Sequence, residues 1–231
     1  MSATLRRTRI KFCGMTRAAD IREAAALGVD AVGVVFAERS RRRVSIPQAV
    51  ALRSCTPPLV DVVALFMDNP ADEVGEVIAR VRPSLLQFHG SESRAYCEQF
   101  GLPYLKAVGM GGQGVDEVLA QIDAHPRAAG FLLDSHAPGA AGGTGEAFDW
   151  AQMPAVEGRP LLLAGGLTPD NVAEAIRATR VWAVDVSSGI EAVPGQKDSG
   201  RMQRFVAAVR AADADEGLSA DGSESACDGV R

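Results

Sequence analysis

Short, continuous apolar runs recur along the chain and alternate with segments that have the spacing of helices. Eight runs predict strands, because uninterrupted apolar sequence is typical of strands covered on both faces. These runs are 9–13, 30–36, 59–67, 84–88, 103–108, 129–134, 160–164 and 181–186. Helices are predicted at 18–27, 47–54, 70–81, 91–100, 115–124, 148–153 and 199–211, and one more is predicted to be capped by Thr168.

Eight strand–helix units in about 210 residues favour one architecture. Regular alternation of strands and helices indicates a parallel sheet, and eight units of this length favour a closed barrel over an open doubly wound sheet. The first strand–helix loop also lacks the Gly-x-Gly-x-x-Gly pattern of dinucleotide-binding folds. We therefore predict a single (β/α)₈ TIM barrel over residues 1–212. A disordered acidic tail is predicted over 213–231, which is rich in Asp, Ser, Gly and Ala.

Charge and composition disfavour several classes of function. The net charge is −5, but residues 211–231 contain six acidic residues and one arginine, so the barrel itself is near neutral. We therefore expect no nucleic-acid partner. No apolar run is long enough to cross a bilayer, and the N-terminus lacks the apolar core of a signal peptide, so a cytoplasmic location is expected. The four cysteines and three histidines show no disulfide framework or metal-ligand spacing, so no metal site is expected.

Two candidate catalytic residues stand at the ends of predicted strands, where such barrels place their functional groups. Cys13 ends the first strand and Asp134 ends the sixth. Most free cysteines are small buried hydrophobes, and a lone aspartate is most often a cap or loop residue, so position alone leaves both interpretations open. Strands one and six are three steps apart around a ring of eight. The two side chains could therefore face each other across a small sugar as an acid–base pair.

The loops after the seventh and eighth strands predict a phosphate site. Gly165 and Gly166 expose backbone N–H groups before a helix. The loop of Ser187, Ser188 and Gly189 does the same, and its two serines add hydroxyls. One Gly-Gly pair alone could be a tight turn, but two such loops in consecutive units match the usual phosphate site of these barrels.

A basic loop over residues 39–43 follows the second strand. Arg42 in this loop either belongs to a run of solvated charges or binds a substrate carboxylate through its planar guanidinium. The residue types alone leave these two interpretations open.

Five stretches, found in order over residues 8–210, resemble the phosphoribosylanthranilate isomerases of tryptophan biosynthesis. They are KFCGMT at 11–16, QFHG at 87–90, LLD at 132–134 with GGTG at 142–145 and FDW at 148–150, LAGGLTPDN at 163–171, and VDVSSGIE at 184–191 with PGQKD at 194–198. One stretch alone would be weak support, whereas the five together are specific to this family.

The resemblance implies an activity and roles for residues. The family consists of (β/α)₈ barrels without cofactor or metal. They convert N-(5-phosphoribosyl)anthranilate into 1-(2-carboxyphenylamino)-1-deoxyribulose 5-phosphate by an Amadori rearrangement. The resemblance implies that Cys13 is the general base and Asp134 the general acid. It also implies that Arg42 binds the anthranilate carboxylate and that Asp185 lies near the substrate amine. The phosphate is expected on Gly165, Gly166, Ser187, Ser188 and Gly189.

Some assignments stay open. Arg43 stands where the family usually has an aromatic residue, so either Arg42 or Arg43 could bind the carboxylate. Lys11 points to the same strand face as Cys13 and could favour its thiolate. His89 could contact the residues that bind the substrate without touching the substrate itself. We expect a phosphorylated aminosugar substrate, no membrane partner, and a monomer or homodimer. The alternatives are another sugar-phosphate barrel enzyme or a non-catalytic sugar-phosphate binding protein.

Overall fold

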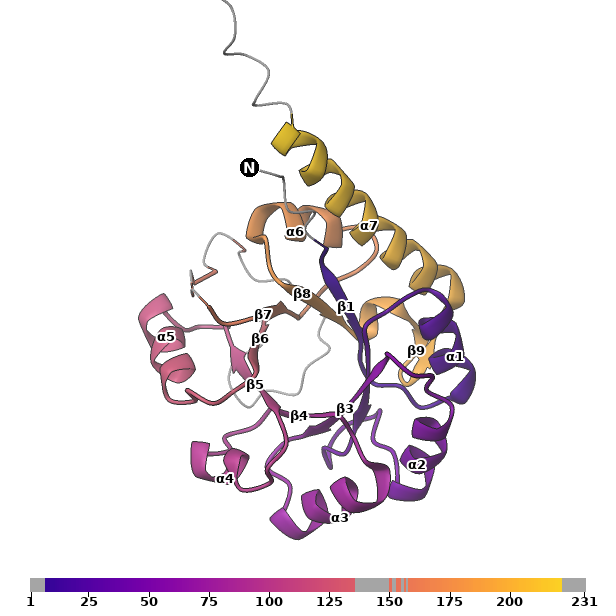
Figure 1. Cartoon of the computed structure of the whole chain (residues 1–231), viewed down its shortest axis with the longest axis vertical. Coiled ribbons are helices and arrows are strands. Elements are labelled where there is room, and N and C mark those ends of the chain that lie inside the picture. The colour runs from indigo at the N-terminus through magenta and orange to yellow at the C-terminus, as the bar shows by residue number, and fades with distance from the viewer. Residues whose placement is uncertain (1–6, 136–149, 151–152, 155, 157, 222–231) are drawn as a thin grey trace, which may run out of the picture.

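The computed structural model describes residues 7–135, 150, 153–154, 156 and 158–221, with side chains up to residue 215. Eight parallel strands form a closed barrel in sequence order, and the eighth pairs with the first (Figure 1). The strands are β1 Arg9–Phe12, β2 Ala31–Val35, β3 Asp61–Phe66, β4 Leu85–Phe88, β5 Tyr104–Gly109, β6 Gly130–Asp134, β7 Leu161–Leu163 and β8 Ala183–Val186. The predicted TIM barrel is confirmed, and each predicted strand is present.

Helices surround the barrel and follow the strands along the chain (Figure 1). Those described are α1 Ala18–Ala26, α2 Ile46–Ser54, α3 Ala71–Val81, α4 Arg94–Glu98, α5 Val115–Asp123, α6 Val172–Thr179 and α7 Ser199–Asp221. None of these helices is long and apolar enough to cross a membrane. Residues 136–149 lie outside the described part, as does most of the helix predicted at 148–153.

Alternate strand residues belong to two different apolar clusters, which explains the continuous apolar runs. Phe131 and Leu133 of β6 pack with Val118 and Ile122 of α5, outside the barrel. Leu132, between them in sequence, belongs to a cluster that otherwise contains side chains of the strands and their immediate ends, within the barrel. Because side chains alternate along a strand, a strand covered on both faces is apolar at most of its positions.

The helix after β7 starts later than predicted. Thr168 does not cap it, because α6 begins at Val172 and Asn171 is its N-cap residue. Thr168 Oγ1 instead accepts a hydrogen bond from the Asp170 amide at 3.2 Å, and Asn171 Oδ1 accepts one from the Thr168 amide at 2.8 Å. Short polar side chains that bond to nearby backbone favour a turn over a helix, and here they insert one before α6.

The loop after β8 contains a small hairpin that the apolar pattern did not predict. A 3₁₀ turn at Ser188–Ile190 leads into β9 Glu191–Val193, which pairs antiparallel with β10 Gln196–Lys197. Strands of three and two residues are too short to give a periodic signal. The hairpin brings Glu191 and Lys197 to the side of the barrel mouth.

The last helix also extends further than predicted. It packs against α6 and α1 and continues past residue 211 to Asp221 (Figure 1). Asp213 accepts a hydrogen bond from the Thr8 amide at 3.0 Å, and Asp215 pairs with Arg177 at 2.6 Å. The acidic composition suggested disorder from residue 213, yet these carboxylates hold the helix against the barrel. The rest of the predicted tail, 222–231, lies outside the described residues.

Candidate active site

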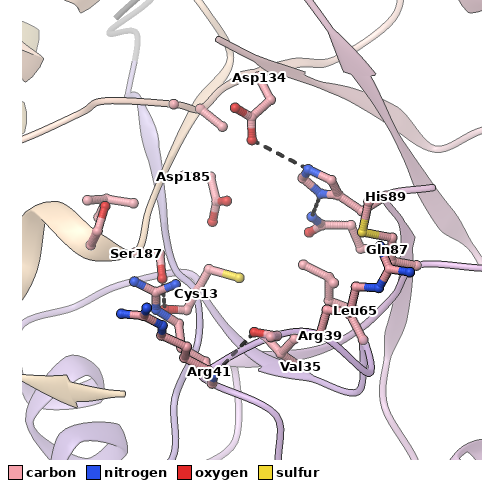
Figure 2. A pocket seen from close by; sticks show the side chains of 18 of the residues that line it. Cys13, Val35, Arg39, Arg41, Leu65, Gln87, His89, Asp134, Asp185 and Ser187 are labelled. Atoms are coloured by element: carbon pink, nitrogen blue, oxygen red, sulfur yellow. Dashed lines mark hydrogen bonds and ion pairs between the residues drawn. The ribbon is translucent and has the colours of Figure 1, made fainter. Parts of the chain in front are cut away.

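A pocket of about 730 Å³ lies at the carboxyl ends of the strands, and Figure 2 shows it from close by. Most of the sequence-predicted residues meet there: Cys13, Arg42, His89, Asp134, Gly165, Gly166, Asp185, Ser187 and Ser188. Three others, Lys11, Arg43 and Gly189, do not line it. Segments that are up to 175 residues apart in sequence therefore form one site. Among the described residues, no group of three or more His, Cys, Asp or Glu is arranged to hold a metal ion.

Cys13 follows β1 directly, and its position is fixed by neighbouring backbone. Its amide donates to the Val186 carbonyl at 2.9 Å, and its side chain packs against Val35 and Ala37. Gly33 of β2 makes room for it, since a Cβ at residue 33 would lie 2.9 Å from the Cys13 Sγ. Gly14, with a φ of +73°, lets the chain turn where a Cβ would collide with the Arg42 side chain. The sequence places small residues where the site is most crowded.

A buried ion pair lies beside Cys13. Lys11 and Asp185 are register partners on β1 and β8, and their Nζ and Oδ1 atoms are 2.7 Å apart. Burial disfavours the charged form of Lys11, but the attraction of Asp185 and Cys13 outweighs it and raises the pKa of Lys11. Both side chains are nearly inaccessible to water, so these two opposite charges lie in a region of low dielectric beside the pocket.

Burial raises the pKa of the Cys13 thiol above its usual value. The charges of Lys11 and Lys197 pull that pKa down, while Asp185 pushes it up. The sequence suggested that Lys11 could favour the thiolate, and its effect does have this sign. The desolvation of Cys13 is nevertheless the larger effect, so the net shift of the pKa is upward.

Asp134 ends β6 and is linked to a short chain of polar side chains (Figure 2). His89 Nε2 lies 3.4 Å from Asp134 Oδ2, and Gln87 Nε2 lies 3.2 Å from His89 Nδ1. When Gln87 donates to Nδ1, His89 carries a hydrogen on Nε2 and directs it toward Asp134. Gln87 Oε1 is buried and has no hydrogen-bond partner among the described residues. The sequence analysis missed Gln87, although a polar residue in an otherwise apolar strand was a signal.

Arg42 lines the pocket, and Glu191 holds it. The Arg42 Nε and Nη2 atoms donate to Glu191 Oε1 and Oε2 at 2.8 and 2.6 Å. Lys197 Nζ lies 2.9 Å from the same carboxylate. Arg43 instead pairs with Glu73 at 3.2 Å and is not among the pocket-lining residues. The sequence analysis missed Glu191 and Lys197 as site residues because it did not predict the hairpin that carries them.

The two predicted anion loops lie side by side at one edge of the pocket. Gly165 and Gly166 have φ angles of +80° and +63°, a left-handed backbone that glycine adopts without steric cost. Ser187 and Ser188 line the pocket next to them. Gly189 has a packing role, because a Cβ there would collide with the Leu167 carbonyl oxygen. The geometry therefore places four of the five predicted phosphate-binding residues at the pocket.

Comparisons with known proteins identify the family of this chain. The family model described as N-(5'phosphoribosyl)anthranilate (PRA) isomerase matches residues 10–208. The N-(5'-phosphoribosyl)anthranilate isomerase of Xanthomonas campestris pv. campestris (strain 8004) is 58% identical over 220 residues, which cover 94% of this chain and 99% of the relative.

Solved structures give the same result. The phosphoribosyl anthranilate isomerase from Thermotoga maritima has a TM-score of 0.80 and 32% identity, with 88% of this chain and 99% of that chain covered. Another solved phosphoribosyl anthranilate isomerase has a TM-score of 0.75 and 30% identity, with the same coverage. It is in complex with reduced 1-(o-carboxyphenylamino)-1-deoxyribulose 5-phosphate.

Proposed function

Because this chain belongs to the N-(5'-phosphoribosyl)anthranilate isomerase family, we propose that Cys13 and Asp134 are the base and the acid of its reaction. The enzyme converts N-(5'-phosphoribosyl)anthranilate into 1-(2-carboxyphenylamino)-1-deoxyribulose 5-phosphate, a step of tryptophan biosynthesis. This is an isomerisation of an aminoaldose to an aminoketose. Hydrogen must therefore leave C2 of the sugar and hydrogen must be added at C1.

One observation supports a pair of proton-transfer groups. The side chains of Cys13 and Asp134 enter the same pocket from β1 and β6, which are three steps apart around the closed ring. Figure 2 shows both of them directed into this pocket, with Asp185 on its wall. Two proton-transfer groups on different sides of one substrate can act on two different atoms of it.

The reaction then needs two proton transfers by these side chains, followed by a tautomerisation. Asp134 donates a proton to the ring oxygen as the C1–O bond breaks, and the nitrogen lone pair forms an iminium at C1. This cation makes the C2 hydrogen acidic. The Cys13 thiolate removes that hydrogen as a proton, and the C2–H electrons form a C1–C2 double bond while the iminium nitrogen becomes neutral. The resulting enolamine gains a proton at C1 and loses its hydroxyl proton, which gives the ketone.

The neighbours of the two groups suit these steps. The Cys13 thiol must lose its proton before it can act as a base. Burial raises its pKa and opposes this loss, whereas the cations Lys11 and Lys197 favour it. His89 lies against Asp134 and fixes the direction of its carboxyl group. Asp185, held by Lys11, is the group proposed to face the substrate amine.

The two charged ends of the substrate have separate binding groups in this proposal. Arg42 binds the anthranilate carboxylate, a role favoured over Arg43 because Arg42 lines the pocket and Arg43 does not. Gly165, Gly166, Ser187 and Ser188 bind the phosphate through backbone N–H groups and hydroxyls. A cytoplasmic location, the absence of a nucleic-acid partner, and a monomeric or homodimeric state remain predictions from the sequence.

The decay of the substrate's intrinsic anthranilate fluorescence tests the proposal. Cys13→Ser and Asp134→Asn should each lower kcat by about 10²- to 10⁴-fold, the usual contribution of a general acid or base. Cys55→Ser, a half-buried cysteine outside the pocket, is the matched control and should retain full turnover. Near-normal turnover in either active-site variant, with circular dichroism showing a folded barrel, would overturn the assignment.

A further inference from the structure

Glu191 lies at the centre of a buried cluster that contains two cations. Its carboxylate accepts two hydrogen bonds from Arg42, one from Lys197, and one from the Gly195 amide at 3.1 Å. The side chains of Glu191, Lys197 and Arg42 are 4%, 0% and 15% exposed. An ion cluster this well shielded from water is little screened by salt and holds a single geometry.

The two hydrogen bonds between Arg42 and Glu191 leave part of the guanidinium available to bind a ligand. A guanidinium has five N–H donors in one plane, and Glu191 takes the edge formed by Nε and Nη2. The edge formed by Nη1 and the second Nη2 hydrogen has no acceptor among the described residues. Arg42 also lines the pocket, so this second edge is the one that can meet a ligand. A carboxylate matches it with two parallel hydrogen bonds.

We propose that Glu191 is a positioning residue that sets the plane of the Arg42 guanidinium, so that its free edge meets the anthranilate carboxylate of the substrate. This inference rests on the proposed role of Arg42. Glu191 itself does not touch the substrate in this proposal and acts only through Arg42.

The charges of the cluster support this role. Arg42 and Lys197 carry two positive charges and Glu191 one negative charge, which leaves one positive charge to balance one substrate carboxylate. Burial disfavours the Glu191 carboxylate, but hydrogen bonds and attraction from Arg42 and Lys197 outweigh it and lower the pKa of Glu191. Without the second cation, Glu191 would neutralise Arg42, and without Glu191 the two buried cations would repel each other.

The hairpin that carries Glu191 is itself tied to the barrel. Lys197 donates from its amide to Asp20 at 3.2 Å and accepts from Arg17 at 3.0 Å. Thr16 donates to the Gly195 carbonyl, and Arg201 donates to the Glu191 carbonyl. Because both hairpin strands are anchored, Glu191 presents its carboxylate from a fixed frame. A group held in this way can orient a long arginine side chain at little further cost in entropy.

Two substrates separate this role from a general structural one. N-(5-phosphoribosyl)anthranilate carries the carboxylate, and N-(5-phosphoribosyl)aniline lacks it. In the wild type, kcat/KM should be higher for the first. Glu191→Gln should raise KM for the anthranilate substrate by about 10- to 100-fold, since one charge-assisted interaction is lost, and should change its kcat little. The same variant should leave kcat/KM for the aniline substrate unchanged. The preference, meaning the ratio of kcat/KM for the anthranilate substrate to that for the aniline substrate, should therefore largely disappear.

Two further variants keep the test decisive. Glu73→Gln changes the half-buried partner of Arg43, away from the pocket, and should preserve the preference for the anthranilate substrate. Glu191→Asp keeps the negative charge between the cations but shortens the reach to Arg42, so it should lower the preference even where Glu191→Gln does not fold. If the wild type shows the preference and a folded Glu191 variant retains it, this inference is wrong. If the wild type itself shows no preference, the carboxylate role proposed for Arg42 fails first, and this inference fails with it.

Discussion

Gly33 of β2 offers a sharp test of how the barrel positions Cys13. A Cβ at this position would lie 2.9 Å from the Cys13 Sγ and 3.2 Å from its Cα. Normal van der Waals contact needs about 3.5–4.0 Å, so Gly33→Ala must move one of the two by about 0.6–1 Å. The Gly33 carbonyl accepts from the Met15 amide at 2.9 Å, and the Cys13 amide donates to Val186. Both backbones are therefore anchored, and the Sγ is the atom most free to move.

The expected effect is a large loss of rate together with a bounded loss of stability. A displacement of about 1 Å at a catalytic group costs about 10²-fold in rate, so kcat should fall by about that factor. Replacing glycine by alanine without contact would raise the free energy of unfolding by about 0.4–1 kcal/mol through the unfolded chain. Overpacking opposes this with about 1–3 kcal/mol, so the net loss should be at most about 2.5 kcal/mol.

The assay combines fluorescence decay of the substrate with urea unfolding. Gly75→Ala is the matched control, because Gly75 lies inside α3 and a Cβ there would meet nothing within 4 Å. This control should raise the free energy of unfolding by about 0.5–1 kcal/mol and leave kcat unchanged. A Gly33→Ala enzyme whose kcat stays within about threefold of wild type would refute the steric argument, since misplacement is expected to cost far more.

Four other predictions follow from the charged and titratable groups. Lys11→Met should lower the free energy of unfolding in urea by about 3–5 kcal/mol, because it leaves Asp185 as an unpaired buried carboxylate; a loss below about 1 kcal/mol would contradict this. Because burial raises the pKa of Cys13, kcat/KM should still climb with pH at and above about 8.5, where an ordinary thiol titrates. A plateau already reached below that pH would count against Cys13 as the base. The folded chain keeps a thiol proton that the unfolded chain releases as pH rises through the ordinary thiol pKa of about 8.5. Cys13 should therefore make the free energy of unfolding fall as pH rises there, as unfolding of wild type and Cys13→Ser at several pH values can show. Asp213→Asn should cost about 1–3 kcal/mol in the same urea assay, since the Thr8 amide loses a charged acceptor, and an unchanged midpoint would place the C-terminal helix outside the cooperative unit.

The barrel could be predicted from the sequence because its signal is repeated eight times. Each strand is covered on both faces, so each is a continuous apolar run, and the alternation with helices constrains the topology strongly. The ends of these strands then indicated Cys13 and Asp134, because the closed ring brings all carboxyl ends to one face. Residues whose place depends on barrel topology alone were therefore the ones that could be found.

Residues whose place depends on side-chain contacts could not be found in this way. Glu191 and Lys197 sit on a hairpin of five strand residues, too short for any periodicity. Asp213 belongs to a segment with the composition of disorder, and its bond to the Thr8 amide is a contact between residues far apart in sequence that composition does not reveal. The net pKa of Cys13 depends on the balance between burial and the charges of Lys11, Lys197 and Asp185, and spacing along the chain gives no measure of burial.

The most direct test of the central claim is the kinetic isotope effect with substrate deuterated at C2. If Cys13 removes this hydrogen, Cys13→Ser makes that step slower and the isotope effect on kcat should rise above the wild-type value. If Asp134 opens the ring, Asp134→Asn makes the earlier, isotope-insensitive step limiting, and the effect should fall toward one. An effect that rises in Asp134→Asn and vanishes in Cys13→Ser would contradict the proposed roles and exchange the acid with the base.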